Sequence, residues 1–249
     1  MVIPPTISVI MPVSHTEEFL AEAVGSILTQ TYRYLELLVI CDPLQEEVAQ
    51  ILAGFDDPRL RIIVPKAVLS VGVAMNYAKD YLQGEFVARM DSDDIALPDR
   101  FEKEITFLHE HPNVGVVGGQ IEYINEDGSH QQDLKLPCSY TGILLAMPRY
   151  NPIANSTFLM RRKDYMALHY DPGMVYGNED YDYWVRAARQ GVIIRNLPDV
   201  VLKYRMKDRT KLGGVFYERN AQRNVIERGI RERARGLVSR NFNQILRSF

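Results

Sequence analysis

The stretch Glu85-Phe-Val-Ala-Arg-Met-Asp-Ser-Asp-Asp94 joins an apolar run to a cluster of carboxylates. Residues 85–90 have the composition of a strand, so the carboxylates stand at its carboxyl end, where open α/β sheets bind their ligands. Mg²⁺ and Mn²⁺ prefer oxygen ligands and usually take one or two carboxylates together with substrate phosphates. The stretch therefore predicts a metal and diphosphate site at a sheet edge. The alternative is a solvated loop in which Asp94 or Asp99 caps a helix.

Strands and helices alternate on the amino-terminal side of this stretch. Short β-rich or continuous apolar runs, which are typical of buried parallel strands, occupy residues 6–11, 35–41, 60–64 and 86–90. Segments with helical spacing of apolar residues lie between them at 17–30, 44–53 and 70–82. The alternation predicts an α/β fold with a Rossmann-like, mostly parallel central sheet flanked by helices.

The sequence after this stretch is less regular. We expect helices at residues 98–110 and 178–190, and strands at 114–117, 120–124, 156–160, 192–194 and 200–204. No internal repeat or low-complexity linker interrupts this part of the chain.

The bulk composition limits the classes of protein to consider. The 249 residues are 46% hydrophobic, which is enough for one large domain or a domain with an appendage. A net charge of -3 gives no general attraction to nucleic acid. Cys41 and Cys138 lack metal-ligand spacing and are typical of free thiols in a reducing compartment. Because no signal peptide pattern precedes the first strand and no apolar run reaches the roughly 18 residues of a membrane span, we expect a cytoplasmic protein or one peripheral on the cytosolic face of a membrane.

Several segments in a fixed order resemble the family 2 glycosyltransferases, which have the GT-A fold. The longer matching segments are Ile7–Val13, Ser26–Tyr32, Leu35–Asp42, Gly84–Asp94 and Asn178–Arg186. The shorter ones are Asn76, Leu97–Arg100, Asn151–Ile153, Ser156–Arg161 and Tyr204–Arg205. Each motif is modest, but the ordered set spans about residues 6–206 and is highly specific.

The resemblance implies inverting transfer of a sugar from a nucleotide-sugar, commonly a UDP-sugar, to a hydroxyl of a glycan or lipid-linked glycan, with bound Mn²⁺ or Mg²⁺. The Gln-x-x-Arg-Trp signature of processive synthases is absent, so we expect the non-processive type that builds bacterial surface glycans. The implied catalytic domain is 1–210, with a nucleotide-sugar-binding half at about 1–112 and an acceptor-binding half at about 113–210. A helical extension follows at 211–249.

The resemblance also implies roles for individual residues. Asp180 would be the catalytic base, Asp93 the metal ligand, and Asp91 a neighbour of the ribose or the metal. The implied contacts with the nucleotide-sugar are Pro12, Val13, Asp42, Asn76, Asp91 and Ser92. Among these, Asp42 would read the base.

The chemistry of the residue types supports these roles. A divalent cation offsets the charge of a departing diphosphate, and a carboxylate base contributes roughly 10²–10⁴-fold. Asp180 would stand at a helix start, which holds it in place but favours its charged form and so lowers its basicity. Asp182 is the alternative base. Asp42 is alternatively a turn residue before Pro43. Trp184 is expected in the core rather than as a sugar platform.

Two of the chain's departures from the family pattern bear most directly on the expected site. Cys41-Asp42-Pro43-Leu44 stands where the family usually has Asp-Asp-Gly-Ser. Lys207 falls where a histidine often follows Tyr-Arg; a lysine can face a diphosphate but is a poor metal ligand while protonated. These departures keep open a non-catalytic relative that binds a nucleotide or a partner. A nucleotidyltransferase is a weaker alternative, because Pro12-Val-Ser-His15 replaces the glycine-rich, basic phosphate loop.

The segment 211–249 is basic and amphipathic, with arginines in excess of glutamates and apolar residues at helical spacing. It is predicted either to lie on an anionic membrane surface, or to pack its apolar stripe on the catalytic domain or on a second subunit of a homodimer. Packing on protein is the simpler expectation.

Overall fold

The computed structural model of the chain describes residues 7–13, 18–41, 46–67, 69–174 and 179–206. Three predictions fall outside the described residues: the base contact of Asp42, the diphosphate contact of Lys207 and the helical extension at 211–249. Within the described part of the chain, no helix combines the length and apolar character needed to cross a membrane.

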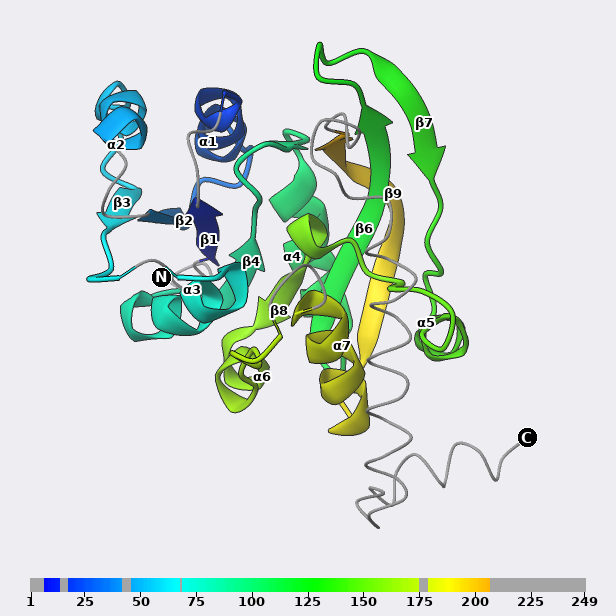
Figure 1. Cartoon of the computed structure of the whole chain (residues 1–249). Coiled ribbons are helices and arrows are strands. Elements are labelled where there is room, and N and C mark those ends of the chain that lie inside the picture. The colour runs from blue at the N-terminus through cyan, green and yellow to red at the C-terminus, as the bar shows by residue number, and fades with distance from the viewer. Residues whose placement is uncertain (1–6, 14–17, 42–45, 68, 175–178, 207–249) are drawn as a thin grey trace, which may run out of the picture.

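The amino-terminal half forms the parallel part of the sheet (Figure 1). Its strands are β1 (Ile7–Val13), β2 (Leu35–Cys41), β3 (Leu60–Ile63) and β4 (Phe86–Arg89), in the spatial order β3-β2-β1-β4. Every pairing among them is parallel. All residues of β1 and β2 are buried, which explains why their sequences are mostly apolar. The two polar residues, Ser8 and Glu36, are hydrogen-bonded to each other at 2.6 Å. Because the strands are parallel, Val13, Cys41 and Arg89 end at the same edge of the sheet.

Helices cover both faces of these strands. One face carries α1 (Leu20–Leu28), α2 (Glu46–Ala53) and α4 (Arg100–Glu110), and the other carries α3 (Val71–Tyr77) followed by the 3₁₀ helix η1 (Ala78–Tyr81). In α1 the residues at helical spacing, among them Leu20, Ala23 and Ile27, have no exposed surface. The strands alternate between the two layers: Val9 faces α1, and Ile10 faces α3.

The carboxyl-terminal half extends the sheet with mixed pairings. It contains β5 (Ile95–Ala96), β6 (Val116–Ile124), β7 (His130–Leu134), β8 (Leu159–Arg161) and β9 (Ile194–Arg205), with α5 (Tyr140–Ala146), η2 (Asn155–Thr157), α6 (Arg162–Ala167) and α7 (Glu179–Arg189). Strand β8 joins the halves, because it pairs antiparallel with both β4 and β6. Strand β6 runs parallel to β9 and antiparallel to β7. The described strands form one nine-stranded sheet, so the predicted α/β fold is confirmed, with a sheet that is parallel in its first half and mixed as a whole.

Two predicted breaks between strands do not occur. The predicted pieces 114–117 and 120–124 belong to the single strand β6, whose register shifts between Gly118 and Gln120. A Cβ atom on Gly119 would lie 2.4 Å from a methyl carbon of Val201, so β6 and β9 approach closely at this glycine. The predicted strands 192–194 and 200–204 likewise form the single strand β9.

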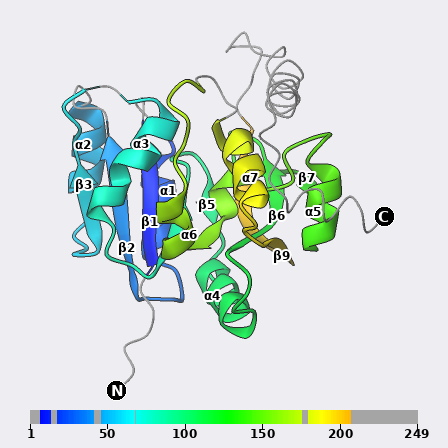
Figure 2. The same ribbon diagram turned by 90° about the horizontal axis from the view of Figure 1, so that it is seen from below.

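Helices α3, α6 and α7 lie on the same side of the sheet (Figure 2), and aromatic rings cluster beneath them. Trp184 is fully buried and meets Phe158 edge to face, with ring centroids 5.0 Å apart. The prediction that Trp184 belongs to the core is therefore confirmed. Tyr170 stacks on Tyr183 of α7 at 4.3 Å, and the Cβ position of Gly72 in α3 would be 3.4 Å from Glu179. These contacts bring the first turn of α7 next to the first turn of α3.

Candidate active site

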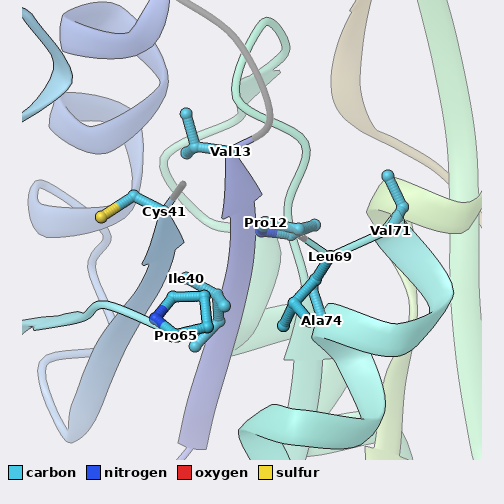
Figure 3. A pocket seen from close by; sticks show the side chains of 8 residues that line it. All are labelled: Pro12, Val13, Ile40, Cys41, Pro65, Leu69, Val71 and Ala74. Atoms are coloured by element: carbon cyan, nitrogen blue, oxygen red, sulfur yellow. The ribbon is translucent and has the colours of Figure 1, made fainter. Parts of the chain in front are cut away.

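A pocket opens at the carboxyl edge of the parallel strands (Figure 3). Residues from the ends of β1 and β2 and from the start of α3 line it: Pro12, Val13, Ile40, Cys41, Pro65, Leu69, Val71 and Ala74. Apolar walls of this kind suit a flat ring such as a nucleobase. The predicted nucleotide contacts Pro12 and Val13 lie in this pocket, and Asp42 follows the lining residue Cys41 in the sequence.

Asp91 is held between the two halves of the molecule. Its Oδ1 accepts a hydrogen bond of 2.8 Å from Nε of Arg89, and its Oδ2 accepts one of 2.6 Å from the hydroxyl of Ser156 in η2. Burial by itself would lower the pKa of Arg89, but the charges of Asp91 and Glu179 outweigh it and raise the pKa above its ordinary value, so the guanidinium stays charged. Asp91 thus keeps a fixed orientation while its side chain remains 26% exposed.

The rest of the acidic cluster is anchored by the end of β9. Asp94 is buried, and its Oδ1 accepts a 3.0 Å hydrogen bond from the backbone N–H of Arg205. Nε of Arg205 donates to the carbonyl of Asp93 at 3.0 Å, which fixes the turn. Burial, followed by the charges of Asp91 and Asp93, raises the pKa of Asp94 well above its ordinary value. Ser92 is buried between these acids, and Asp93 is only partly exposed.

The carboxylates that follow β4 form the place where the sequence predicts a metal site. Among the described residues, no group of three or more His, Cys, Asp or Glu side chains is placed to hold a metal ion. The second oxygen of Asp94 is buried without a hydrogen-bond partner in this part of the chain. The described part of the acidic cluster therefore offers a buried carboxylate oxygen to an ion, but it does not supply a full set of ligands.

Asp180 lies in the first turn of α7 and is partly buried. Its Oδ1 accepts the backbone N–H of Tyr181 at 2.7 Å, and its Oδ2 accepts a 2.9 Å hydrogen bond from Nδ2 of Asn151. Burial, with the nearby charges of Glu179 and Asp91, raises the pKa of Asp180 to about 7, whereas Arg89 acts in the opposite direction. The expected lowering of basicity by the helix start is thus outweighed by desolvation.

The alternative base, Asp182, is engaged within its own helix. It accepts a 2.7 Å hydrogen bond from Nε of Arg186 one turn later, and it is buried. A carboxylate paired in this way is less available to a substrate. Asp180, whose partners are neutral N–H groups, has the environment that general bases require.

Asn76 holds the segment that follows α6. Its Nδ2 donates to the carbonyl of Tyr170 at 2.8 Å, and its Oδ1 accepts the backbone N–H of Tyr170 at 2.9 Å. The predicted contact of Asn76 with the nucleotide-sugar stays a prediction, since these bonds give the amide a structural task as well.

Three residues of the site had no role assigned from the sequence: Arg89, Asn151 and Ser156. Arg89 gave a usable signal, because a charged residue inside a buried strand needs a partner. Asn151 and Ser156 gave no signal beyond the segments that contain them, since their contacts with Asp180 and Asp91 join distant parts of the chain.

Comparison with known sequences identifies relatives over most of the chain. The family described as Glycosyl transferase family 2 matches residues 8–169. An O-antigen biosynthesis glycosyltransferase, WbnJ of Escherichia coli, is 33% identical over 218 residues, which cover 85% of each chain. An uncharacterized glycosyltransferase of Haemophilus influenzae is 32% identical over 236 residues, covering 90% of this chain and 72% of that protein.

Comparison with solved structures agrees with this result at the level of the fold. Crystal structures of S. aureus TarS 1–349 superpose with a TM-score of 0.66 at 20% identity for one, and 0.67 at 19% identity for its complex with UDP-GlcNAc. The chain spans 62% and 59% of the length of these two TarS chains. The expected GT-A fold is thus confirmed, and the sequence match extends over more than half of the chain. This protein belongs to glycosyltransferase family 2.

Proposed function

We propose that the protein transfers a single sugar, with inversion at the anomeric carbon, from a UDP-sugar to a hydroxyl of a glycan or lipid-linked glycan. The observation that carries this proposal is the partly buried carboxylate of Asp180, whose pKa is raised to about 7, beside the charged pair of Arg89 and Asp91. In the reaction, the acceptor oxygen bonds to the anomeric carbon, the bond from that carbon to the diphosphate breaks, and Asp180 takes the hydroxyl proton. A base with a pKa near the working pH is suited to this task.

The donor would occupy the edge of the parallel strands. The apolar pocket at Pro12 and Val13 is proposed to hold the nucleoside, and the turn of Asp91 and Ser92 lies at the end of the strand next to β1. Relatives support the donor class: TarS has been crystallised with UDP and with UDP-GlcNAc. An E. coli relative that is 31% identical over 121 residues is named as a UDP-Glc:alpha-D-GlcNAc-diphosphoundecaprenol β-1,3-glucosyltransferase.

A divalent cation, Mn²⁺ or Mg²⁺, is part of the proposal. The acidic cluster fits such an ion because its carboxylates are close enough to raise the pKa of Asp94, and because one oxygen of Asp94 is buried without a hydrogen-bond partner among the described residues. The missing ligands would come from the donor's diphosphate. Asp93 and Asp91 would hold the ion. When bound, it would offset the charge of the departing diphosphate.

The acceptor side and the cellular setting belong to the same proposal. The half of the chain from about residue 113 would bind the acceptor, because it carries Asp180 and Asn151. A site on the cytosolic face of a membrane, contact with that membrane through 211–249 and assembly as a homodimer remain predictions.

Binding of UDP tests the donor site. Calorimetric titration of UDP, and then of GDP, with and without Mn²⁺, would use the native protein, Asp93→Ala and the control Asp133→Ala. Asp133 is a matched control because its carboxylate on β7 is 59% exposed. We expect UDP binding that needs Mn²⁺, disappears in Asp93→Ala and persists in Asp133→Ala. Binding of GDP alone would change the donor class, and binding of neither nucleotide would contradict the UDP/GDP donor assignment.

Turnover tests the reaction class. A screen of UDP-sugars should release UDP, and Asp180→Asn should lower that release by roughly 10²–10⁴-fold without abolishing UDP binding. Release of pyrophosphate instead would indicate a nucleotidyltransferase. Tight UDP binding without turnover of any sugar donor would indicate a non-catalytic relative.

A further inference from the structure

The side chain of Asn151 lies against the proposed base in a single orientation. Its Nδ2 donates to Oδ2 of Asp180 at 2.9 Å, while its own Oδ1 accepts the backbone N–H of Ile153 at 3.3 Å. Because an amide oxygen cannot donate, a flipped amide would place two oxygens against each other at Asp180 and two N–H groups against each other at Ile153. The turn thus directs the donor end of Asn151 toward the carboxylate.

The segment that carries Asn151 is tied down on both sides. Pro152 restricts the backbone of Asn151, and the carbonyl of Pro152 accepts a 2.9 Å hydrogen bond from Nδ2 of Asn196, which is buried in β9. At the other side, the hydroxyl of Tyr181 donates to the carbonyl of Met147. Tyr181 follows Asp180 in α7, so the segment and the base are fastened to the same helical turn.

From this arrangement we propose that Asn151 is a positioning residue for the reaction: it holds the carboxylate of Asp180 in the orientation that receives the acceptor's proton. The inference rests on the proposed role of Asp180 as the base. The backbone N–H of Tyr181 fixes one carboxylate oxygen and Asn151 fixes the other. Each oxygen keeps a lone pair, so the carboxylate of Asp180 is oriented and can still accept a proton.

The physical effect of this contact is on geometry and on charge together. A general base acts only within hydrogen-bond reach of the proton, and a misplacement of about 1 Å can reduce a rate roughly 10²-fold. A donated N–H also favours the charged carboxylate. The charged and titratable groups that face Asp180 are Glu179 on α7, Arg89 and Asp91 at the end of β4, and Tyr170 before α7. Asn151 is the neutral donor among them.

The test compares Asn151→Ala and Asn151→Asp in the full chain, alone and combined with Asp180→Asn. Asn151→Asp is isosteric and still accepts the N–H of Ile153, but it turns an acceptor toward Asp180, so it separates the hydrogen bond from packing. Asn125→Ala is the matched control, because the Asn125 amide donates at 2.9 Å to Ser129 in an exposed turn. The measurements are kcat against pH with a UDP-sugar, UDP affinity by calorimetry, and Tm.

We expect Asn151→Ala to lower kcat about 10- to 100-fold and to move the acid limb of the pH profile to higher pH, with UDP affinity and Tm close to those of the native protein. Asn151→Asp should lower kcat further at pH 7, because two carboxylates then face each other. Neither change should reduce the residual rate of Asp180→Asn, since Asn151 acts through Asp180.

Native kcat and an unchanged acid limb in Asn151→Ala would overturn the inference. So would a further loss of the same size in the Asp180→Asn background, which would mean a merely structural role. Absence of turnover by the native protein would instead overturn the proposed function itself, and with it the role of Asn151. The two failures are therefore distinguishable.

Discussion

The carboxylates at the end of β4 and the carboxylate at the start of α7 have the same chemistry but opposite surroundings. Asp91 is paired with the charged guanidinium of Arg89 and the hydroxyl of Ser156. Asp180 is partly buried and receives only the neutral N–H groups of Asn151 and Tyr181, and its pKa is raised to about 7. Charged partners thus stabilise the ionised form of a carboxylate, whereas burial with neutral partners raises the pKa of a carboxyl group so that it can exchange a proton.

The largest expected effect comes from changing Asp180 at the start of α7. Asp180→Asn should lower kcat by roughly 10²–10⁴-fold, because it removes the general base, with little change in UDP affinity. Steady-state kinetics and calorimetry measure the two quantities. Asp182→Asn, on the same helix, is the control and should keep kcat within a few fold. The reverse pattern would make Asp182 the base.

The next effect comes from changing Arg89, the charged partner of Asp91 at the end of β4. Arg89→Met should lower the free energy of unfolding by about 3–5 kcal/mol, because it leaves Asp91 without its charged partner in a mostly buried site. The same change removes the cation that holds down the pKa of Asp180, so the acid limb of kcat should move to higher pH. Urea unfolding and a pH profile provide the measurements.

Lys103→Met is the control for this variant, because Lys103 pairs with Asp99 and their side chains are 34% and 50% exposed. It should cost about 1 kcal/mol. Equal losses of stability in the two variants would argue against a special role for the Arg89–Asp91 pair.

A smaller effect comes from changing Ser156, which contacts Asp91 where the two halves of the sheet meet. Ser156→Ala should lower the free energy of unfolding by roughly 1.5–3 kcal/mol, because the buried hydroxyl donates to the charged Asp91. UDP binding in Mn²⁺ should weaken as Asp91 loses its fixed orientation. Ser129→Ala removes a comparable but exposed bond to Asp127 and should change neither quantity measurably. Matching behaviour of the two variants would contradict this account.

A further effect concerns stability against pH. The pKa of Asp180 is raised to about 7 in the folded protein from an ordinary value of 3.8. Between these values the unfolded chain loses the proton first, so ionisation favours unfolding and stability falls as pH rises toward 7. Asp180→Asn removes this penalty and should therefore be more stable than the native protein at pH 8, with a much smaller difference at pH 4. Urea unfolding at both pH values measures it, and a stability gain that is independent of pH would contradict the raised pKa.

The parallel half of the molecule was predictable because its signals are local. A strand buried on both faces is mostly apolar, and a helix on such a sheet carries an apolar stripe. The runs at residues 35–41 and 86–90 therefore predicted β2 and β4, and the position of Asp91 to Asp94 after a strand predicted their place at the carboxyl edge. The mixed half gave weaker signals, since the pairing of β6 with β9 depends on close approach at Gly119.

By itself, the sequence determined the α/β class, the order of the elements from β1 to β4, the acidic edge after β4 and the position of Asp180 at the start of a helix. Only the tertiary structure decided which groups meet there. Asn151 and Asp180 are 29 positions apart, and Asp91 and Ser156 are 65 apart. The raised pKa of Asp180 has the same origin, because burial is a property of the packed helix and strands around a residue. Local spacing fixes periodicity and turns, whereas hydrogen bonds between distant segments and desolvation arise only when the two halves of the sheet pack together.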